Sequence, residues 1–256
     1  MFEMSAIFLA GFWAGMINIV VGSGTLVTFP VLLLFGYPPI VANISNNIGL
    51  VAGGLSGVWG YRKELAPNKE LITLLLPASA VGGLAGALLL FILPPSAFNT
   101  VVPTLIIAGI LMVAFGPSLQ RRVAQRQRVA TNDQPGRKPI VLIVGVFVLG
   151  MYGGYFGAAQ GILIVGLMGI LTTVALQQIN AVKNVLTTAV NGIAAIIFMV
   201  VAWQLINWQI TALIAAGSLL GGMMGARFGR KLPPMALRAT IVLVGLVALT
   251  KLLIFP

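Results

Sequence analysis

Apolar residues in this chain come in long runs broken by small residues, and this pattern limits the fold more than any other feature. They make up 59% of the 256 residues. Ten runs cover about 5–22, 25–36, 40–61, 70–93, 98–118, 139–157, 161–174, 179–205, 208–229 and 235–255. About 20 apolar residues in a helix span the hydrocarbon core of a bilayer, where backbone polar groups must be bonded internally. The sequence therefore predicts an all-α polytopic membrane protein.

The basic residues gather in connections, although the net charge of +11 could also suggest nucleic acid as a partner. Six lie in one polar segment: Arg121, Arg122, Arg126, Arg128, Arg137 and Lys138. Others flank apolar runs: Arg62, Lys63, Arg227, Arg230 and Lys231. Connections rich in Lys and Arg stay on the cytoplasmic side of membrane proteins. We therefore interpret the charge as an orientation signal, with the bilayer and not nucleic acid as partner.

Chemically reactive side chains are scarce. The chain has four acids, no histidine and no cysteine. Metal sites, acid–base pairs and thiol nucleophiles are built from those residue types. The four acids, Glu3, Glu64, Glu70 and Asp133, lie in connections or at the N-terminus. We therefore expect no enzyme, no cofactor and no metal, and an anionic cargo in preference to a cation.

The chain is an internal duplication with an offset of 139 residues. Gly82-Gly83 and Gly86-Ala87 align with Gly221-Gly222 and Gly225-Ala226, and both halves then continue with Leu-Pro-Pro; 8 of 16 residues are identical across 82–97. These glycine patterns favour close helix packing. We expect two repeats, 1–118 and 139–256, joined by a cytoplasmic basic linker, 119–138. Keeping all the basic clusters cytoplasmic makes the repeats inverted, with both termini outside, in the plasma membrane.

Each repeat opens with a glycine break followed by a short run. The breaks are Val21-Gly22-Ser23-Gly24 and Gly157-Ala158-Ala159-Gln160-Gly161. A run of 12 to 14 residues is roughly 20 Å long as a helix, less than the ~30 Å hydrocarbon core. The short segments, 25–36 and 161–174, either cross as broken helices or form re-entrant hairpins. Paired breaks of this kind indicate the binding site of a secondary transporter.

Polar residues concentrate near the breaks in both repeats. With the breaks they give the predicted substrate site: Gly22, Ser23, Gly24, Asn43, Ser45, Asn46, Asn47, Gln160, Gly161, Asn180, Lys183, Asn184, Thr187, Thr188 and Asn191. Short polar side chains beside helix N-termini favour anions. Each could instead join helices at about 0.6 kcal/mol. Lys183 either contacts the anion or snorkels to an interface.

The chain resembles the sulfite exporter TauE/SafE family of membrane permeases. The likeness rests on residues 11–15, 22–24, Pro30, 32–36, 42–46, 82–95, 153–157, 160–161, 181–184 and 221–234. It departs at 157–161, and at Ser45, where the family often has threonine. The resemblance implies export of small sulfur-containing anions such as sulfite or organosulfonates.

The leading hypothesis is a secondary transporter that exports such an anion by alternating access, with the site where the repeats meet. Two alternatives stay open: an anion channel, and a membrane-embedded enzyme or assembly factor acting on a lipid or partner protein. Flat Gly/Ala helix faces make a homodimer plausible.

Overall fold

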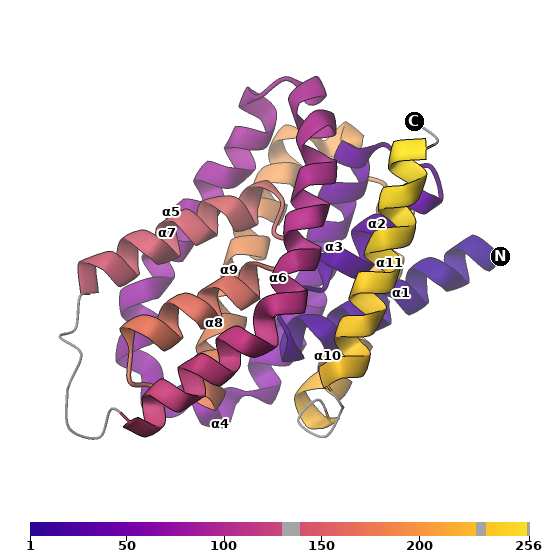
Figure 1. Cartoon of the computed structure of the whole chain (residues 1–256). Coiled ribbons are helices and arrows are strands. Elements are labelled where there is room, and N and C mark those ends of the chain that lie inside the picture. The colour runs from indigo at the N-terminus through magenta and orange to yellow at the C-terminus, as the bar shows by residue number, and fades with distance from the viewer. Residues whose placement is uncertain (130–138, 229–233, 255–256) are drawn as a thin grey trace.

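The computed structural model describes residues 1–129, 139–228 and 234–254, and these are helical with no strand among them. The predicted all-α class is confirmed (Figure 1). Each of the ten predicted segments corresponds to one helix. The helices are α1 (Phe2–Val20), α2 (Thr25–Leu34), α3 (Pro39–Gly60), α5 (Lys69–Ile92), α6 (Pro95–Val129), α7 (Pro139–Tyr155), α8 (Gln160–Leu171), α9 (Leu176–Val201), α10 (Trp208–Phe228) and α11 (Pro234–Ile254). Short turns, α4 (Arg62–Leu65), η1 (Ala66–Asn68) and η2 (Trp203–Leu205), fill two connections.

The polar linker is partly helical, which the sequence reasoning did not anticipate. α6 continues through residues 119–129, inside the segment expected to be linker. Gln, Arg, Ala and Val dominate there, and no glycine or proline interrupts them before Val129. Gln, Arg and Ala are strong helix formers, so the helix continues after the apolar run has ended. Residues 130–138 of the linker lie outside the described part of the chain.

Four helices in the described part of the chain are long and apolar enough to cross a membrane. They are Phe2–Val20, Arg62–Ile92, Leu176–Val201 and Trp208–Phe228. Shorter apolar helices include α2, of 10 residues, and α8, of 12 residues. These lengths agree with the short runs predicted after each glycine break.

Glycines let the first helix of each half pack against a helix of the other half. A Cβ added to Gly11 would meet Ile214, and one added to Gly15 would meet Ser218, so α1 and α10 run in the same direction. In the same way Gly82 and Gly86 of α5 meet Phe147 and Met151 of α7. The predicted role of the glycine pattern in close packing is confirmed.

The central helices α3 and α9 run antiparallel where they touch. Asn47 bonds to Asn191, and Gly54, further along α3, lies against Thr188, earlier in α9. α3 runs with α10 and α5 runs with α9, as shown by Gly49 with Ile214, Gly53 with Ser218, Ser79 with Leu186 and Gly83 with Val190. Each of these helices therefore runs antiparallel to its counterpart in the other half of the chain.

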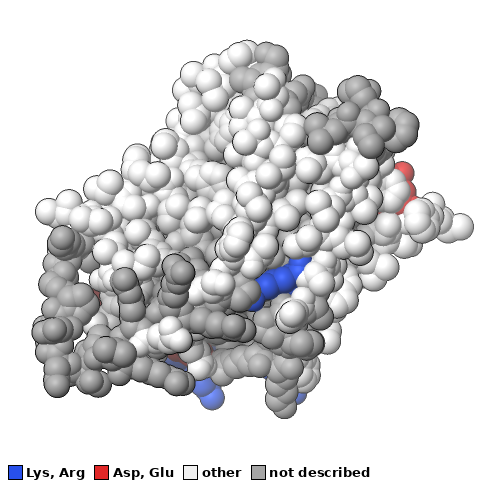
Figure 2. All heavy atoms as spheres, in the orientation of Figure 1, with Lys and Arg blue, Asp and Glu red and all other residues white. Residues whose placement is uncertain are grey.

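Charged side chains are sparse on the face shown in Figure 2. The largest patch of visible Lys and Arg atoms lies in the middle of this face, between α6 and α11, and smaller groups lie at its lower edge, near α4 and the end of α10. An acidic group is visible at the right edge, beside the start of α1. The remaining described surface of this face is almost free of charge, as a lipid-facing surface should be.

Candidate functional site

The first glycine break is the tip of a helical hairpin. At its open end the rings of Phe2 and Phe35 pack edge to face, with centroids 6.4 Å apart, and the Tyr37 hydroxyl donates to Glu3. At its tip the amide of Gly24 donates to Oδ1 of Asn18, 3.4 Å away. α1 and α2 are therefore antiparallel.

The second break has the same form. A Cβ on Gly145 of α7 would touch Leu167 of α8, while Nε2 of Gln160 donates to the carbonyl of Leu149, nearer the tip, at 3.0 Å. The Tyr152 hydroxyl also donates to the carbonyl of Ala158, at 2.5 Å. Both hairpins turn through a glycine of positive φ two residues after the first helix: Gly22 (φ 90°) and Gly157 (φ 75°).

The two hairpin tips meet backbone to backbone. The amide of Gly161 donates to the carbonyl oxygen of Gly22, 3.1 Å away, and a Cβ on Gly22 would lie 2.6 Å from Cα of Gly161. Behind the tips, Phe29 of α2 packs edge to face on Phe156 of the second tip, with ring centroids 5.0 Å apart. The structure thus brings together two glycine breaks that are far apart in the sequence.

α3 and α9 place their polar residues at matching helical positions. Asn43, Asn46 and Asn47 are the fifth, eighth and ninth residues of α3, counted from Pro39. Asn180, Lys183 and Asn184 are the fifth, eighth and ninth residues of α9, counted from Leu176. The helix starts set an offset of 137 residues in this region, where the sequence comparison used 139. The mirrored clusters differ most at the eighth position, which is neutral Asn46 in one half and Lys183 in the other.

Each cluster donates to the end of the first helix in the other half of the chain. Nδ2 of Asn43 bonds to the carbonyl oxygen of Tyr155, the last residue of α7, at 3.0 Å. Nζ of Lys183 bonds to the carbonyl oxygens of Asn18 and Ile19, in the last turn of α1, at 3.2 and 3.0 Å. The last carbonyls of a helix have no partner within the helix, and they form the negative end of its dipole. The polar clusters therefore hold both hairpins in place.

Lys183 is completely buried, with 0% of its surface exposed. Snorkelling to an interface, one of the two interpretations open from sequence, does not describe this side chain. Its stem passes the second hairpin tip, because a Cβ on Gly161 would lie 2.9 Å from Cδ of Lys183. Its amine thus lies among α1, α9 and both tips.

The other predicted site residues form hydrogen bonds to several different helices. The Asn46 amide bonds to Thr25 and accepts from Thr28, both on α2, and Nδ2 of Asn47 donates to Asn191 at 3.3 Å. The Ser45 hydroxyl instead accepts the amide of Asn207, just before α10, at 3.0 Å. Thr187 and Thr188 donate to carbonyls one turn back on their own helix, those of Lys183 and Asn184. Ser45 therefore faces α10.

Several predicted site residues keep a buried polar atom that no described residue pairs. These atoms are Ser23 Oγ, Asn47 Oδ1, Asn180 Oδ1 and Asn184 Nδ2. Buried polar groups in folded proteins are nearly always hydrogen-bonded, and each exception calls for an explanation. These atoms come from the first hairpin tip and from the polar clusters of α3 and α9.

Sequence reasoning did not single out three residues of this region. Thr25 and Thr28 of α2 contact Asn46, and Asn18 contacts both Gly24 and Lys183. A usable signal existed, because two threonines three residues apart on one face of a short, otherwise apolar helix suggest a polar partner.

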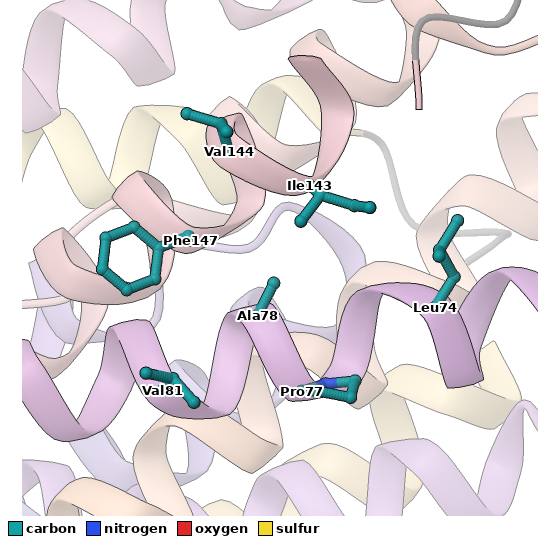
Figure 3. Close-up of a pocket in the computed structure, with 7 residues that line it drawn as sticks. All are labelled: Leu74, Pro77, Ala78, Val81, Ile143, Val144 and Phe147. Atoms are coloured by element: carbon teal, nitrogen blue, oxygen red, sulfur yellow. The ribbon is translucent and has the colours of Figure 1, made fainter. Parts of the chain in front are cut away.

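An apolar hollow of about 430 Å³ lies elsewhere, between α5 and α7. Its lining residues are Leu74, Pro77, Ala78, Val81, Ile143, Val144 and Phe147 (Figure 3). Leu74, Val81 and Val144 are exposed at its edge, and it holds none of the predicted site residues. With no polar side chain in its lining, it offers nothing to hold an anion.

Comparison with known proteins gives a consistent result along the whole chain. The family model described as "Sulfite exporter TauE/SafE" matches residues 7–252. A probable membrane transporter protein of Haemophilus influenzae is 27% identical, covering 97% of this chain and 94% of that protein. Probable membrane transporter proteins of Sinorhizobium sp (ORF9) and Escherichia coli K12 (YfcA) are 25% and 26% identical, covering 99% and 98% of this chain and 93% and 89% of theirs. No solved structure matches. The chain is a membrane transporter that belongs to the sulfite exporter TauE/SafE family.

Proposed function

We propose that this protein is a secondary transporter that exports small sulfur-containing anions, sulfite or organosulfonates, across the plasma membrane by alternating access. The observation that carries the proposal is the presence of two buried donors without a partner among the described residues, Ser23 Oγ and Asn184 Nδ2. A hydroxyl and an amide N–H can donate to an oxyanion, and Lys183 adds a positive charge when it is protonated. The name of the family, a sulfite exporter, supports the substrate class.

The proposed cycle uses the two hairpins as elements of an inverted repeat. Repeat 1–118 contributes α1 and α2, repeat 139–256 contributes α7 and α8, and the linker 119–138 lies in the cytoplasm with both termini outside. The antiparallel course of α3 and α9 supports this inversion. Rocking of one repeat against the other would open the tips first to one side and then to the other. The anion then crosses without a continuous pore.

Flux in proteoliposomes tests the proposal. Sulfite and short alkylsulfonates should show saturable uptake and counterflow, and Asn184→Ala should lower the flux at least tenfold because it removes an unpaired donor. Asn68→Ala is a matched control, since Asn68 is also a buried asparagine but bonds to the carbonyl of Glu64, outside the site. Flux without saturation or counterflow would indicate a channel, and an unaffected Asn184→Ala variant would remove the site assignment.

A further inference from the structure

We propose that Lys183 binds a proton together with the anion and releases it with the anion, so that the protein is a proton–anion symporter. The inference rests on the proposed transport function and adds its coupling ion. Lys183 is fully buried, between the end of α1 and the second hairpin tip. An uncompensated charge is expensive in such a place.

The hydrogen bonds of the amine match its neutral form. A neutral amine has two N–H donors and a lone pair, whereas an ammonium has three N–H donors and a charge. Within the described part of the chain, Nζ donates to two carbonyl oxygens, those of Asn18 and Ile19. A third proton would add both a donor and a charge, and a bound oxyanion would satisfy both at once.

No acid in the described residues is bonded to this amine. On the helices and turns around α9, the acids are Glu3 at the far end of α1, Glu64 in α4 and Glu70 at the start of α5. The basic residues are Arg62 and Lys63 in α4, Lys69 at the start of α5, and Arg121, Arg122, Arg126 and Arg128 at the end of α6. The tyrosines are Tyr61 after α3, and Tyr152 and Tyr155 in α7. α3, α8 and η2 have none within their bounds. The described acid bonded to α9 is Glu64, which accepts from Gln177 and not from Lys183. The counter-charge of a protonated Lys183 therefore has to come from the cargo.

The two halves differ at this position, because only one of them has a titratable side chain there. The position of α3 that matches Lys183 is Asn46, whose amide is bonded to Thr25 and Thr28. Lys183 is the one buried lysine among the described residues, which predicts one proton per cycle. The proton comes from water on the loading side, adds to the lone pair of Nζ as the anion binds, and returns to water on the other side when the anion leaves. One proton and one negative charge cross together, so a cycle with a monovalent anion moves no net charge.

The test needs an anion that does not itself carry a proton, and 2-hydroxyethanesulfonate, the anion of a strong acid, meets this condition. Proteoliposomes contain a pH-sensitive dye, and valinomycin with potassium sets the membrane potential. We expect one proton to move per sulfonate, and an initial rate that changes less than twofold between 0 and −100 mV. Saturable sulfonate flux that moves no protons and rises steeply with potential would overturn the symport. Absence of saturable flux for every sulfur anion would instead overturn the proposed function.

Lys183→Arg isolates the proton step, because a guanidinium keeps its proton at all accessible pH values. The loaded carrier can still cross, so this change should lower sulfonate exchange less than it lowers net flux. The unloaded carrier would have to return with a buried charge, so net flux should fall at least tenfold. Equal retention of net flux and exchange in this variant would contradict the proposal. If the variant does not fold, the proton count of the unmodified protein decides alone.

Discussion

The backbone amide of Gly161 donates a hydrogen bond to the carbonyl oxygen of Gly22, 3.1 Å away, and joins the two hairpin tips. Gly22 has φ 90°, and its missing Cβ leaves the space that Gly161 uses. The contact therefore requires glycine for two reasons, conformation and proximity. It fixes both breaks beside Lys183, whose stem lies against Gly161.

Gly22→Ala should separate the tips. The left-handed conformation and the 2.6 Å approach to Gly161 together predict a loss of about 2 to 4 kcal/mol, and transport should be lost as well. Thermal unfolding in detergent and sulfite flux measure the two effects.

Gly192→Ala is the control, because Gly192 lies inside α9 and its Cβ would meet nothing within 4 Å. That change should stabilise the helix by about 0.5 to 1 kcal/mol. Equal melting temperatures for the two variants would contradict the tip contact.

Two buried serines of the predicted site should respond differently to alanine. Ser23 Oγ has no described partner, so Ser23→Ala should leave the melting temperature unchanged or higher while raising the KM for the anion about tenfold. Ser45 Oγ accepts the amide of Asn207, so Ser45→Ala should cost about 1 kcal/mol of stability with a KM within twofold. Melting curves and concentration-dependent flux on both variants check this. The reverse pattern would mean that Ser45, and not Ser23, contacts the anion.

Helix positions could be predicted from the sequence because the apolar runs are set by lipid contact, which is a local property of each segment. The glycine breaks were equally visible, since Gly22 and Gly161 interrupt those runs. Their mutual contact was not, because a backbone hydrogen bond between residues so distant depends on how the two hairpins dock. α6 continues beyond its apolar run for a different reason: the residues that follow are polar but favour a helix, which extends to Val129.

The candidate site was predicted as a set of residue types, and the structure distinguishes among its members. Asn47 and Asn191 pair across the two halves, which an alignment of equivalent positions does not reveal. Ser45 faces α10, because neighbouring residues on a helix point about 100° apart and only part of a polar run can face one partner. The carbonyls that hold Lys183 have no sequence signature, since any residue at the end of α1 would supply them.

Alkaline pH should weaken the open end of the first hairpin. The Tyr37 hydroxyl donates to the Glu3 carboxylate, and this bond, together with burial and the negative charge of Glu3, raises the pKa of Tyr37 above its usual value of about 10. The folded protein thus holds the phenolic proton more tightly than the unfolded chain. The contribution to stability is complete below pH 10 and is lost as the pH rises from 10 through the raised pKa.

Tyr37→Phe removes this dependence and serves as the comparison. At pH 8 the variant should melt at a lower temperature than the unmodified protein, because it lacks the bond to Glu3. Above pH 10 the difference between the two melting temperatures should shrink. Melting curves at several pH values between 8 and 11.5 measure it. A difference that stays constant over this range would show that Tyr37 does not titrate in contact with Glu3.

A disulfide between α3 and α9 should stop transport. A Cβ on Gly54 would lie 3.2 Å from Cβ of Thr188, close to the spacing of about 3.8 Å in a disulfide. The chain contains no cysteine, so Gly54→Cys with Thr188→Cys introduces one defined pair. α3 lies in the first proposed repeat and α9 in the second, so the proposed rocking has to change their contact, and a covalent bond there prevents it. Oxidation should lower the flux of 2-hydroxyethanesulfonate at least tenfold, and reduction should restore it; sulfite is not used because it cleaves disulfides. Each single-cysteine variant controls for oxidation without a cross-link. Undiminished flux through fully cross-linked protein would mean that α3 and α9 stay together during the cycle, and the rocking of the two repeats would have to be abandoned.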